Sequence, residues 1–379
     1  MPIISKPQEF NTQDLYVDLR ATFGFPIHLK CEGFNFAGSI KLKAASGMVE
    51  AAERSGRLAA GSTIVESSSG NLGVALSVIS AAKGYRFICV VDPRTNLATR
   101  KVIESLGGEV HMVTKEAAEG GYLAARTAYV QELVASDRGY VWLNQHANPD
   151  NWRAHYRTTG PEIDKYFPDL EVLFVGAGTT GTLMGCARYF KERGRQVTVV
   201  AVDSVGSVTF GGPPGVRMIP GLGTGVRPAL LDVSFVDDVV HVPESDTVHA
   251  CHTLARGGFL FGGSTGTVVS GALTWLSRHG GGDRVAVAIA PDLGERYLDT
   301  VYQPSWVQDL YGSAAQPSTP APSSPALSTP ALSSTAASSP APVPVGERPA
   351  GSAGRRSGSP IAEKLGDPSL IDFSTGALQ

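Results

Sequence analysis

Residues 35–43 (NFAGSIKLK) carry two lysines, Lys41 and Lys43, at the start of a helical pattern that runs to residue 54. Ser39 is predicted to cap this helix, because its hydroxyl can accept a hydrogen bond from a free N–H group of the first turn. A lysine in the first turn lies at the positive end of the helix dipole, which disfavours the charged form. The resulting free amine is a nucleophile that forms Schiff bases. The segment alone also fits a solvated surface lysine, and it does not choose between the two lysines.

Four loops rich in glycine, serine and threonine are further candidates for chemistry. They span residues 67–73 (SSSGNLG), 176–182 (GAGTTGT), 221–225 (GLGTG) and 262–266 (GGSTG). Three of them open predicted helices, where backbone N–H groups and hydroxyls bind anions. The 176–182 loop is interpreted as a phosphate cradle, because its glycines let the backbone approach an anion and its threonines add donors. It lacks the Gly-Lys-[Ser/Thr] ending of a Walker loop. Apart from Asp203, no acidic residue is evident that would bind the ribose of a dinucleotide.

The elements that position these loops alternate between strands and helices, which predicts an α/β fold. Apolar runs without polar alternation indicate strands that are covered on both faces, and strand–helix repetition predicts parallel-rich sheets. The predicted strands are 27–31, 63–65, 87–91, 110–113, 141–143, 172–175, 197–202, 236–242 and 285–289. Helices are predicted over 41–54, 71–82, 96–106, 115–134, 183–193, 247–256, 266–278 and 295–302, with further helical segments after Pro149. Ligands in such sheets bind beyond the carboxyl ends of the strands.

Composition narrows the class of protein. The 379 residues are 42% hydrophobic and 18% charged, which is typical of a globular protein, and the net charge of −3 gives no support for binding nucleic acid or an anionic membrane. The four cysteines (Cys31, Cys89, Cys186 and Cys251) are far apart in apolar surroundings. They are predicted to be core residues, with no metal site and no disulfide framework. Residues 1–11 do not resemble a signal peptide, and no run is long enough to span a membrane, so a cytoplasmic location is expected.

The last part of the chain has a different composition. Residues 313–360 consist almost entirely of Ser, Ala, Pro, Thr and Gly, and they are predicted to form a disordered, low-complexity linker. Residues 361–379 regain apolar side chains, including Ile361, Leu365 and Phe373. This tail could be a docking peptide for a partner, or a disordered end whose hydrophobic residues are incidental.

Taken together, the motifs resemble the β-family (fold type II) of pyridoxal-phosphate enzymes, which includes cysteine synthase and cystathionine β-synthase. Residues 35–43 look like the family's N-P-x-G-S-x-K-D-R, residues 68–73 like its T-S-G-N-T-G loop, and residues 178–182 like its G-T-G-G-T phosphate loop. Residues 262–266, 158–163 and 294–298 match further family segments. The resemblance covers roughly residues 15–310, and six ordered motifs together make it specific.

The resemblance implies a pyridoxal 5'-phosphate cofactor and assigns roles to individual residues. Lys41 matches the catalytic lysine that holds the cofactor as a Schiff base, and Lys43 falls where the family has arginine. The cofactor-binding set is Lys41, Asn71, Gly178, Thr179, Thr180, Gly181, Thr182 and Ser264, with Asn71 at the ring hydroxyl and Ser264 at the pyridine nitrogen. The pocket for the substrate α-carboxylate is Ser68, Ser69, Gly70 and Gln145. A neutral serine at the ring nitrogen favours loss of a β-leaving group, with Lys41 removing the Cα proton before a nucleophile adds.

The chain departs from the family pattern at Phe36, Leu42 and Leu72. These departures and three segments of the chain resemble N-(2-amino-2-carboxyethyl)-L-glutamate synthases. The segments are residues 35–41, 66–73 and 87–93. This likeness implies O-phospho-L-serine as donor and L-glutamate as nucleophile, in a transferase reaction that leads to 2,3-diaminopropionate for siderophores or peptide antibiotics. A phosphate and an additional carboxylate require cations. The candidates from the sequence are Arg94, Arg100, Arg153, Arg217 and Arg227.

The resemblance also implies a homodimer and two domains. Residues 1–35 and 146–312 would form a large cofactor-binding domain, and residues 36–145 a small mobile domain that closes the site. Two alternatives remain open. One is a cysteine synthase that uses O-acetylserine or O-phosphoserine, and the other is a catalytically silent regulator that binds the cofactor.

Overall fold

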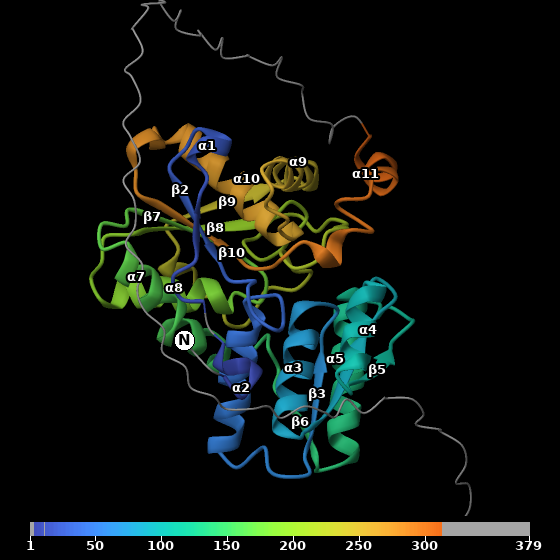
Figure 1. Ribbon diagram of the computed structural model, residues 1–379. Coiled ribbons are helices and arrows are strands. Elements are labelled where there is room, and N and C mark those ends of the chain that lie inside the picture. Colours follow the sequence, from blue (N-terminus) through green and yellow to red (C-terminus); the bar gives the residue numbers. More distant parts are fainter. Residues whose placement is uncertain (1–3, 11, 313–379) are drawn as a thin grey trace, which may run out of the picture. The chain divides into compact units, whose positions relative to one another are not determined.

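The computed structural model describes residues 4–10 and 12–312, which form two sheets with helices packed on them (Figure 1). The predicted linker and tail, residues 313–379, lie outside the described residues. The helices are α1 (Arg20–Phe23), α2 (Lys41–Arg54), α3 (Asn71–Lys83), α4 (Leu97–Ser105), α5 (Gly121–Ser136), α6 (Pro149–Arg157), α7 (Thr159–Tyr166), α8 (Gly181–Glu192), α9 (Glu244–Arg256), α10 (Gly263–Arg278) and α11 (Pro304–Tyr311). Short 3₁₀ turns are η1 (Pro7–Glu9), η2 (Val233–Phe235), η3 (Gly281–Asp283) and η4 (Glu295–Tyr297).

The larger sheet has six strands in the order β1-β2-β10-β7-β8-β9. These strands are β1 (Tyr16–Asp18), β2 (Ile27–Cys31), β10 (Ala286–Ala290), β7 (Val172–Gly176), β8 (Thr198–Ser204) and β9 (Asp238–Val242). Every neighbouring pair is parallel except β1 and β2. The second sheet has the order β5-β4-β3-β6 and is parallel throughout. Its strands are β3 (Thr63–Ser67), β4 (Arg86–Val91), β5 (Glu109–Met112) and β6 (Tyr140–Trp142).

Both faces of each sheet are covered, as the unbroken apolar runs predict. In β7, Val172 and Phe174 pack into a core with α9 and α10, whereas Leu173 and Val175 pack with α7 and α8. In the second sheet, alternate side chains pack on α2 and α3 or on α5. The predicted α/β class with parallel-rich sheets is therefore confirmed. The nine predicted strands lie within a few residues of observed ones, whereas β1 was not predicted.

Three local predictions are wrong. Ser39 does not cap α2, because Ile40 occupies the cap position and no side chain provides a cap hydrogen bond. The helix predicted over 115–134 begins only at Gly121, since Gly120 has a left-handed φ of 77° that ends any helix before it. The helix predicted over 295–302 is a single 3₁₀ turn, η4, because this segment makes polar contacts with other elements instead of continuing.

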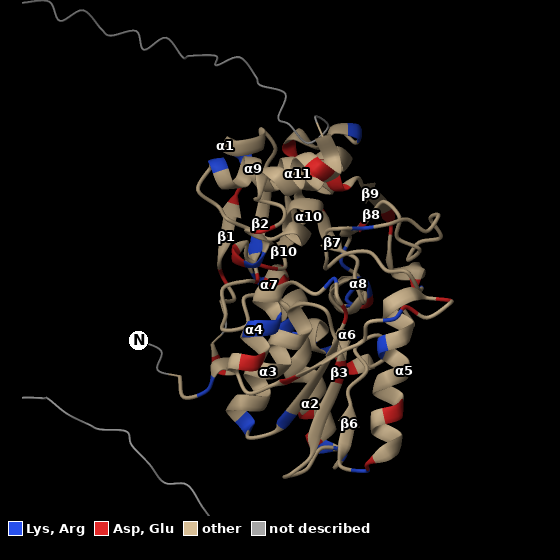
Figure 2. Ribbon diagram, turned by 90° about the vertical axis from the view of Figure 1, so that its right-hand side faces the viewer, with Lys and Arg blue, Asp and Glu red and all other residues tan. Residues whose placement is uncertain are grey.

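The four cysteines are free and buried, so their predicted place in the core is confirmed. Among the described residues, no helix has the length and apolar content needed to cross a membrane. Acidic and basic residues are interspersed along the elements in Figure 2. The division into a large and a small mobile domain stays a prediction, although the two sheets use the segments on which that division was based.

The packing of β7 gives a test of the larger core. Phe174 is fully buried and packs edge-on against Trp275, with ring centroids 5.7 Å apart. We expect Phe174→Ala to lower the free energy of unfolding by about 3–5 kcal/mol, because it leaves a cavity. Urea denaturation followed by circular dichroism measures this change. Val216→Ala is the control, since Val216 is 82% exposed and its truncation should change stability by less than about 0.5 kcal/mol.

Candidate active site

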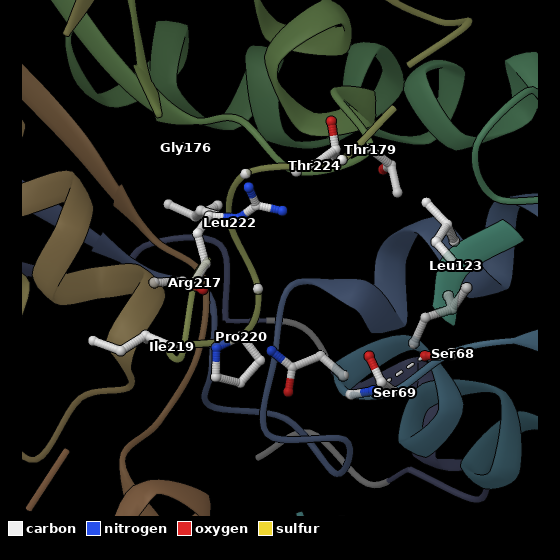
Figure 3. Close-up of a pocket in the computed structure, with 18 of the residues that line it drawn as sticks. Ser68, Ser69, Leu123, Gly176, Thr179, Arg217, Ile219, Pro220, Leu222 and Thr224 are labelled. Atoms are coloured by element: carbon white, nitrogen blue, oxygen red, sulfur yellow. Dashed lines mark hydrogen bonds between the residues drawn. The ribbon is translucent and has the colours of Figure 1, made fainter. Parts of the chain in front are cut away.

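A cavity of about 640 Å³ lies at the carboxyl ends of strands from both sheets. Every cofactor- and substrate-binding residue predicted from the sequence lines it, which brings together segments from Lys41 to Ser264. Figure 3 shows Thr179 and Thr224 on one wall, Arg217, Ile219 and Pro220 on a second, and Ser68, Ser69 and Leu123 across the opening. The roles of the individual residues stay predictions, but their convergence on one cavity is an observation.

Lys41 is the first residue of α2, and its amine lies in the cavity with Thr179 Oγ1 3.4 Å away. Within the described residues, no carboxylate forms an ion pair with it. Burial lowers the pKa of Lys41 to about 8. About a tenth of this amine is therefore uncharged at pH 7, far more than for an ordinary lysine, and a Schiff-base lysine reacts in this uncharged form.

Lys43 has a different environment, although it is only two residues away. Its amine lies 2.9 Å from Glu32 Oε1 and 2.6 Å from Glu162 Oε2, and Lys30 contacts the same two carboxylates. The Lys43 amine is thus engaged by two carboxylates in a buried cluster of two lysines and two glutamates. The structure therefore favours Lys41 as the nucleophilic amine, a choice that the sequence pattern left open.

The loop that follows β7 begins α8 and forms a cradle with backbone and hydroxyl donors. Thr180 has a left-handed φ of 65°, and its buried hydroxyl has no hydrogen-bond partner among the described residues. A Cβ at Gly178 would lie 2.7 Å from the carbonyl oxygen of Gly221, so only glycine fits there. A strained threonine with an unpaired hydroxyl at a helix N-terminus indicates a site for an anion such as phosphate.

His155 supports this cradle from behind. Its Nε2 lies 3.2 Å from Thr182 Oγ1, and its Nδ1 lies 3.0 Å from Thr159 Oγ1. Burial, and then the positive charges of Lys43 and Lys41, lower the pKa of His155 to about 3. The imidazole is therefore neutral near pH 7, and it fixes the direction of the Thr182 hydroxyl without adding charge.

Ser264, at the start of α10, and Gly221 meet on another side of the cavity. A Cβ at Gly221 would lie only 2.1 Å from Ser264 Oγ, and Gly221 has a positive φ of 113°. The 221–225 loop can pass this closely to the serine only because the residue is glycine. The hydroxyl of Ser264 is thus kept at the cavity surface.

Asn71 belongs to a polar network that joins the two sheets. Its Nδ2 donates to Asp292 Oδ2 at 3.0 Å, and its Oδ1 accepts from Arg296 at 2.6 Å. Tyr297 donates to the same Asp292 oxygen at 2.5 Å, and Arg296 also donates to the carbonyls of Ala37 and Gly38. The network fixes Asn71 and leaves its second amide N–H available to a ligand.

The serine loop after β3 and the turn after β6 form the remaining wall. Ser68 Oγ accepts from the backbone N–H of Gly73 at 2.9 Å, so its own O–H remains available as a donor. Gln145 Nε2 donates to the carbonyl of Ser67 at 3.1 Å. Glu66, whose pKa burial raises to about 7, accepts from Trp142 at 3.0 Å and from the N–H of Gln145 at 3.3 Å.

The structure adds two residues that the sequence analysis missed, Arg126 and His146. Arg126, on α5, is 7% exposed and pairs with Asp92 at 3.3 Å, and its Nη1 has no partner among the described residues. Of the five arginines proposed from the sequence, Arg94 and Arg217 line the cavity with Arg126, whereas Arg100, Arg153 and Arg227 do not. In the sequence, Arg126 is part of a helical pattern. That pattern does not show which of its residues face a cavity.

These residues fit pyridoxal 5'-phosphate, the cofactor that the sequence resemblance implies. The amine of Lys41 would bind the aldehyde carbon, and the cradle with the unpaired Thr180 hydroxyl would hold the phosphate. Ser264 and Asn71 offer donors for the ring nitrogen and the ring hydroxyl. None of the predicted contacts places a carboxylate at the ring nitrogen. The pyridine ring would therefore stay neutral.

Comparisons with known proteins support this assignment. The family described as pyridoxal-phosphate dependent enzyme matches residues 9–292. N-(2-amino-2-carboxyethyl)-L-glutamate synthase of Ralstonia nicotianae is 40% identical over 76% of this chain and 86% of its own. The enzyme of the same name from Cupriavidus metallidurans is 38% identical over 80% of this chain and 92% of its own.

Solved structures show the same fold. O-ureido-L-serine synthase is 32% identical, with a TM-score of 0.73 over 82% of this chain and 96% of that one. The O-acetylserine dependent cystathionine beta-synthase from Helicobacter pylori is 27% identical, with a TM-score of 0.73 over 80% of this chain and all of that one.

The contrast between the two lysines predicts where the cofactor attaches. We expect borohydride reduction of the cofactor-loaded protein to label Lys41 and leave Lys43 unlabelled, because of these two amines Lys41 has no carboxylate partner among the described residues. Peptide mass spectrometry locates the label. Lys41→Ala should abolish it, whereas Lys43→Arg, which keeps the charge, should retain it. A label on Lys43 would contradict this account.

The close approach of Gly221 to Ser264 predicts a second effect. Gly221→Ala should raise the dissociation constant of the cofactor by about tenfold or more, because the positive φ and the contact with Ser264 impose about 1–3 kcal/mol of strain. Fluorescence titration of the apoprotein measures the affinity. Gly225→Ala is the matched control in the same loop, since a Cβ there meets no atom within 4 Å. Equal affinities for the two variants would show that the contact is unimportant.

Proposed function

Because this chain belongs to the family of pyridoxal-phosphate dependent enzymes, we propose that it catalyses a β-replacement that joins O-phospho-L-serine and L-glutamate. The products are N-(2-amino-2-carboxyethyl)-L-glutamate and phosphate. The two relatives named for this synthase support the proposal, since the chain aligns with most of their length.

The observation that carries the choice of substrates is the presence of two arginines, Arg126 and Arg217, on different walls of the cavity. Arg126 has a buried guanidinium with one unpaired nitrogen, and Arg217 lies on another wall with its pKa lowered by burial. A buried cation that its own protein only partly satisfies favours an anionic ligand. The donor phosphate and the side-chain carboxylate of glutamate supply such anions, whereas an acetyl ester leaving group and sulfide have no need of these arginines.

The chain's own residues can perform the steps of this reaction. The bound cofactor supplies an electron sink for the donor's Cα. Ser68, Ser69 and Gln145 bind the α-carboxylate and so orient the Cα–H bond. Lys41, once the donor amine has displaced it, is the base that takes the Cα proton, and its pKa near 8 suits this task at neutral pH. Loss of phosphate then leaves the β-carbon open to the amine of glutamate.

Other features belong to the same proposal. A homodimer, closure of the site by a small mobile domain and a cytoplasmic location follow from the family resemblance. The product would serve as a precursor of 2,3-diaminopropionate for siderophores or peptide antibiotics. Residues 361–379 could dock a downstream enzyme, and removal of residues 313–379 should then abolish that interaction while the synthase activity remains.

The proposed reaction is tested by product analysis. We expect the purified protein to release phosphate from O-phospho-L-serine with L-glutamate present, and mass spectrometry should detect equimolar N-(2-amino-2-carboxyethyl)-L-glutamate. Parallel samples receive O-acetyl-L-serine and sulfide. Cysteine formed much faster than the glutamate adduct would identify a cysteine synthase instead. Bound cofactor without turnover of either donor would support the silent regulator.

A further inference from the structure

A second proton transfer in the proposed reaction has no assigned base. Glutamate arrives with a protonated amine, which has no lone pair for attack until it loses a proton. Lys41 cannot take this proton, because at that stage it carries the proton from the donor's Cα and must return it. The cavity therefore needs another group that accepts a proton near Lys41.

The charged groups that line the cavity leave few candidates. Glu116 pairs with Arg94 at 2.8 Å. Asp92 pairs with Arg126 at 3.3 Å and also accepts from the backbone N–H of Arg94 at 2.9 Å. Both carboxylates are thus engaged by arginine. Besides Lys41, His146 is the remaining side chain with a nitrogen lone pair among the described residues that line the cavity, and no ion pair engages it.

His146 is held rigidly at the cavity wall. It lies in a tight turn after β6, in which the backbone N–H groups of Ala147 and Asn148 donate to the carbonyl of Asn144 at 3.1 and 2.9 Å. Asn144 has a left-handed φ of 53°, which is uncommon for a residue other than glycine. Asn148 Nδ2 donates to Leu143 at 2.8 Å, and the buried Glu66 accepts from the neighbouring N–H of Gln145 at 3.3 Å.

The ring of His146 is half-buried, and across the described chain no hydrogen bond engages either of its nitrogens. Burial, and then the positive charges of Lys41 on α2 and Arg126 on α5, lower the pKa of His146 to about 4. The ring is therefore neutral and can accept a proton. Because the carboxylates of the bound donor and of the incoming glutamate bring negative charge toward the same two cations, their presence raises the pKa of His146 and makes the ring a stronger base.

We propose that His146 is the catalytic base that deprotonates the incoming amine of the second substrate. This inference rests on the proposed function, because it requires an ammonium nucleophile. One proton passes from the ammonium to a ring nitrogen of His146, the amine lone pair forms the bond to the donor's Cβ, and Lys41 returns its proton to Cα. In the preceding step the C–O bond breaks and phosphate leaves with the electron pair. Over both steps the ammonium loses one proton and the departing phosphate gains one, with water as carrier.

The test separates the two half-reactions by stopped flow. In His146→Gln, phosphate release from O-phospho-L-serine should stay within about twofold of wild type, which also shows that the variant folds and binds cofactor. The subsequent reaction with L-glutamate should slow by about 10²–10⁴-fold. Azide, an anionic nucleophile that has no proton to lose at neutral pH, should react with H146Q nearly as fast as with wild type. His241→Gln, at an exposed position that does not line the cavity, is the matched control.

The pH dependence gives a second readout. With L-glutamate, the rate of H146Q should be proportional to the fraction of glutamate whose amine is unprotonated. This rate rises about tenfold per pH unit up to the pKa of the amine, whereas the wild-type rate stops rising at a lower pH. Added imidazole should partly restore H146Q. Equal losses with glutamate and azide, or an equal loss of phosphate release, would show that His146 acts only structurally. Wild type that does not react with glutamate at all contradicts the proposed function and this inference with it, whereas equal glutamate rates in wild type and H146Q contradict this inference alone.

Discussion

The site depends on an amine that the protein buries without a counter-charge. Lys41 and Lys43 start the same helix, yet Lys43 is held between Glu32 and Glu162, whereas no carboxylate of the described residues pairs with Lys41. Burial without a partner lowers the pKa of Lys41 to about 8, which makes the amine both a nucleophile and a base at neutral pH. In the buried ion cluster around Lys43, Lys30 contacts the same two carboxylates.

Polar networks between elements hold the surroundings of this amine in place. His155 orients Thr182 in the phosphate cradle from a neutral, buried position. Arg296 contacts the loop before α2 and also Asn71 at the start of α3, so that one guanidinium ties segments of both sheets together. Such networks stabilise one arrangement of the site, because each buried polar group would be costly without its partner.

Much of this arrangement could be predicted from the sequence because the motifs are local. Small-residue loops at helix starts mark the cavity, and unbroken apolar runs mark strands covered on both faces. Contacts between distant segments could not be predicted in the same way. No pattern indicates that Lys43 meets Glu162, that Gly221 passes Ser264, or that Arg126 faces the cavity, since each depends on how two sheets pack. The prediction of the helix cap was also wrong. Ser39 has the residue type of a helix cap, but Ile40 occupies the cap position of α2.

The most direct test of the account is a visible absorbance titration of the cofactor-loaded protein. Addition of O-phospho-L-serine should shift the absorbance of the bound cofactor to longer wavelength with release of phosphate, and L-glutamate should then restore the original spectrum. This result would show that the cavity accepts the phosphorylated donor and passes it to an amine. A shift that occurs only with O-acetyl-L-serine, and that sulfide but not glutamate reverses, would contradict the account.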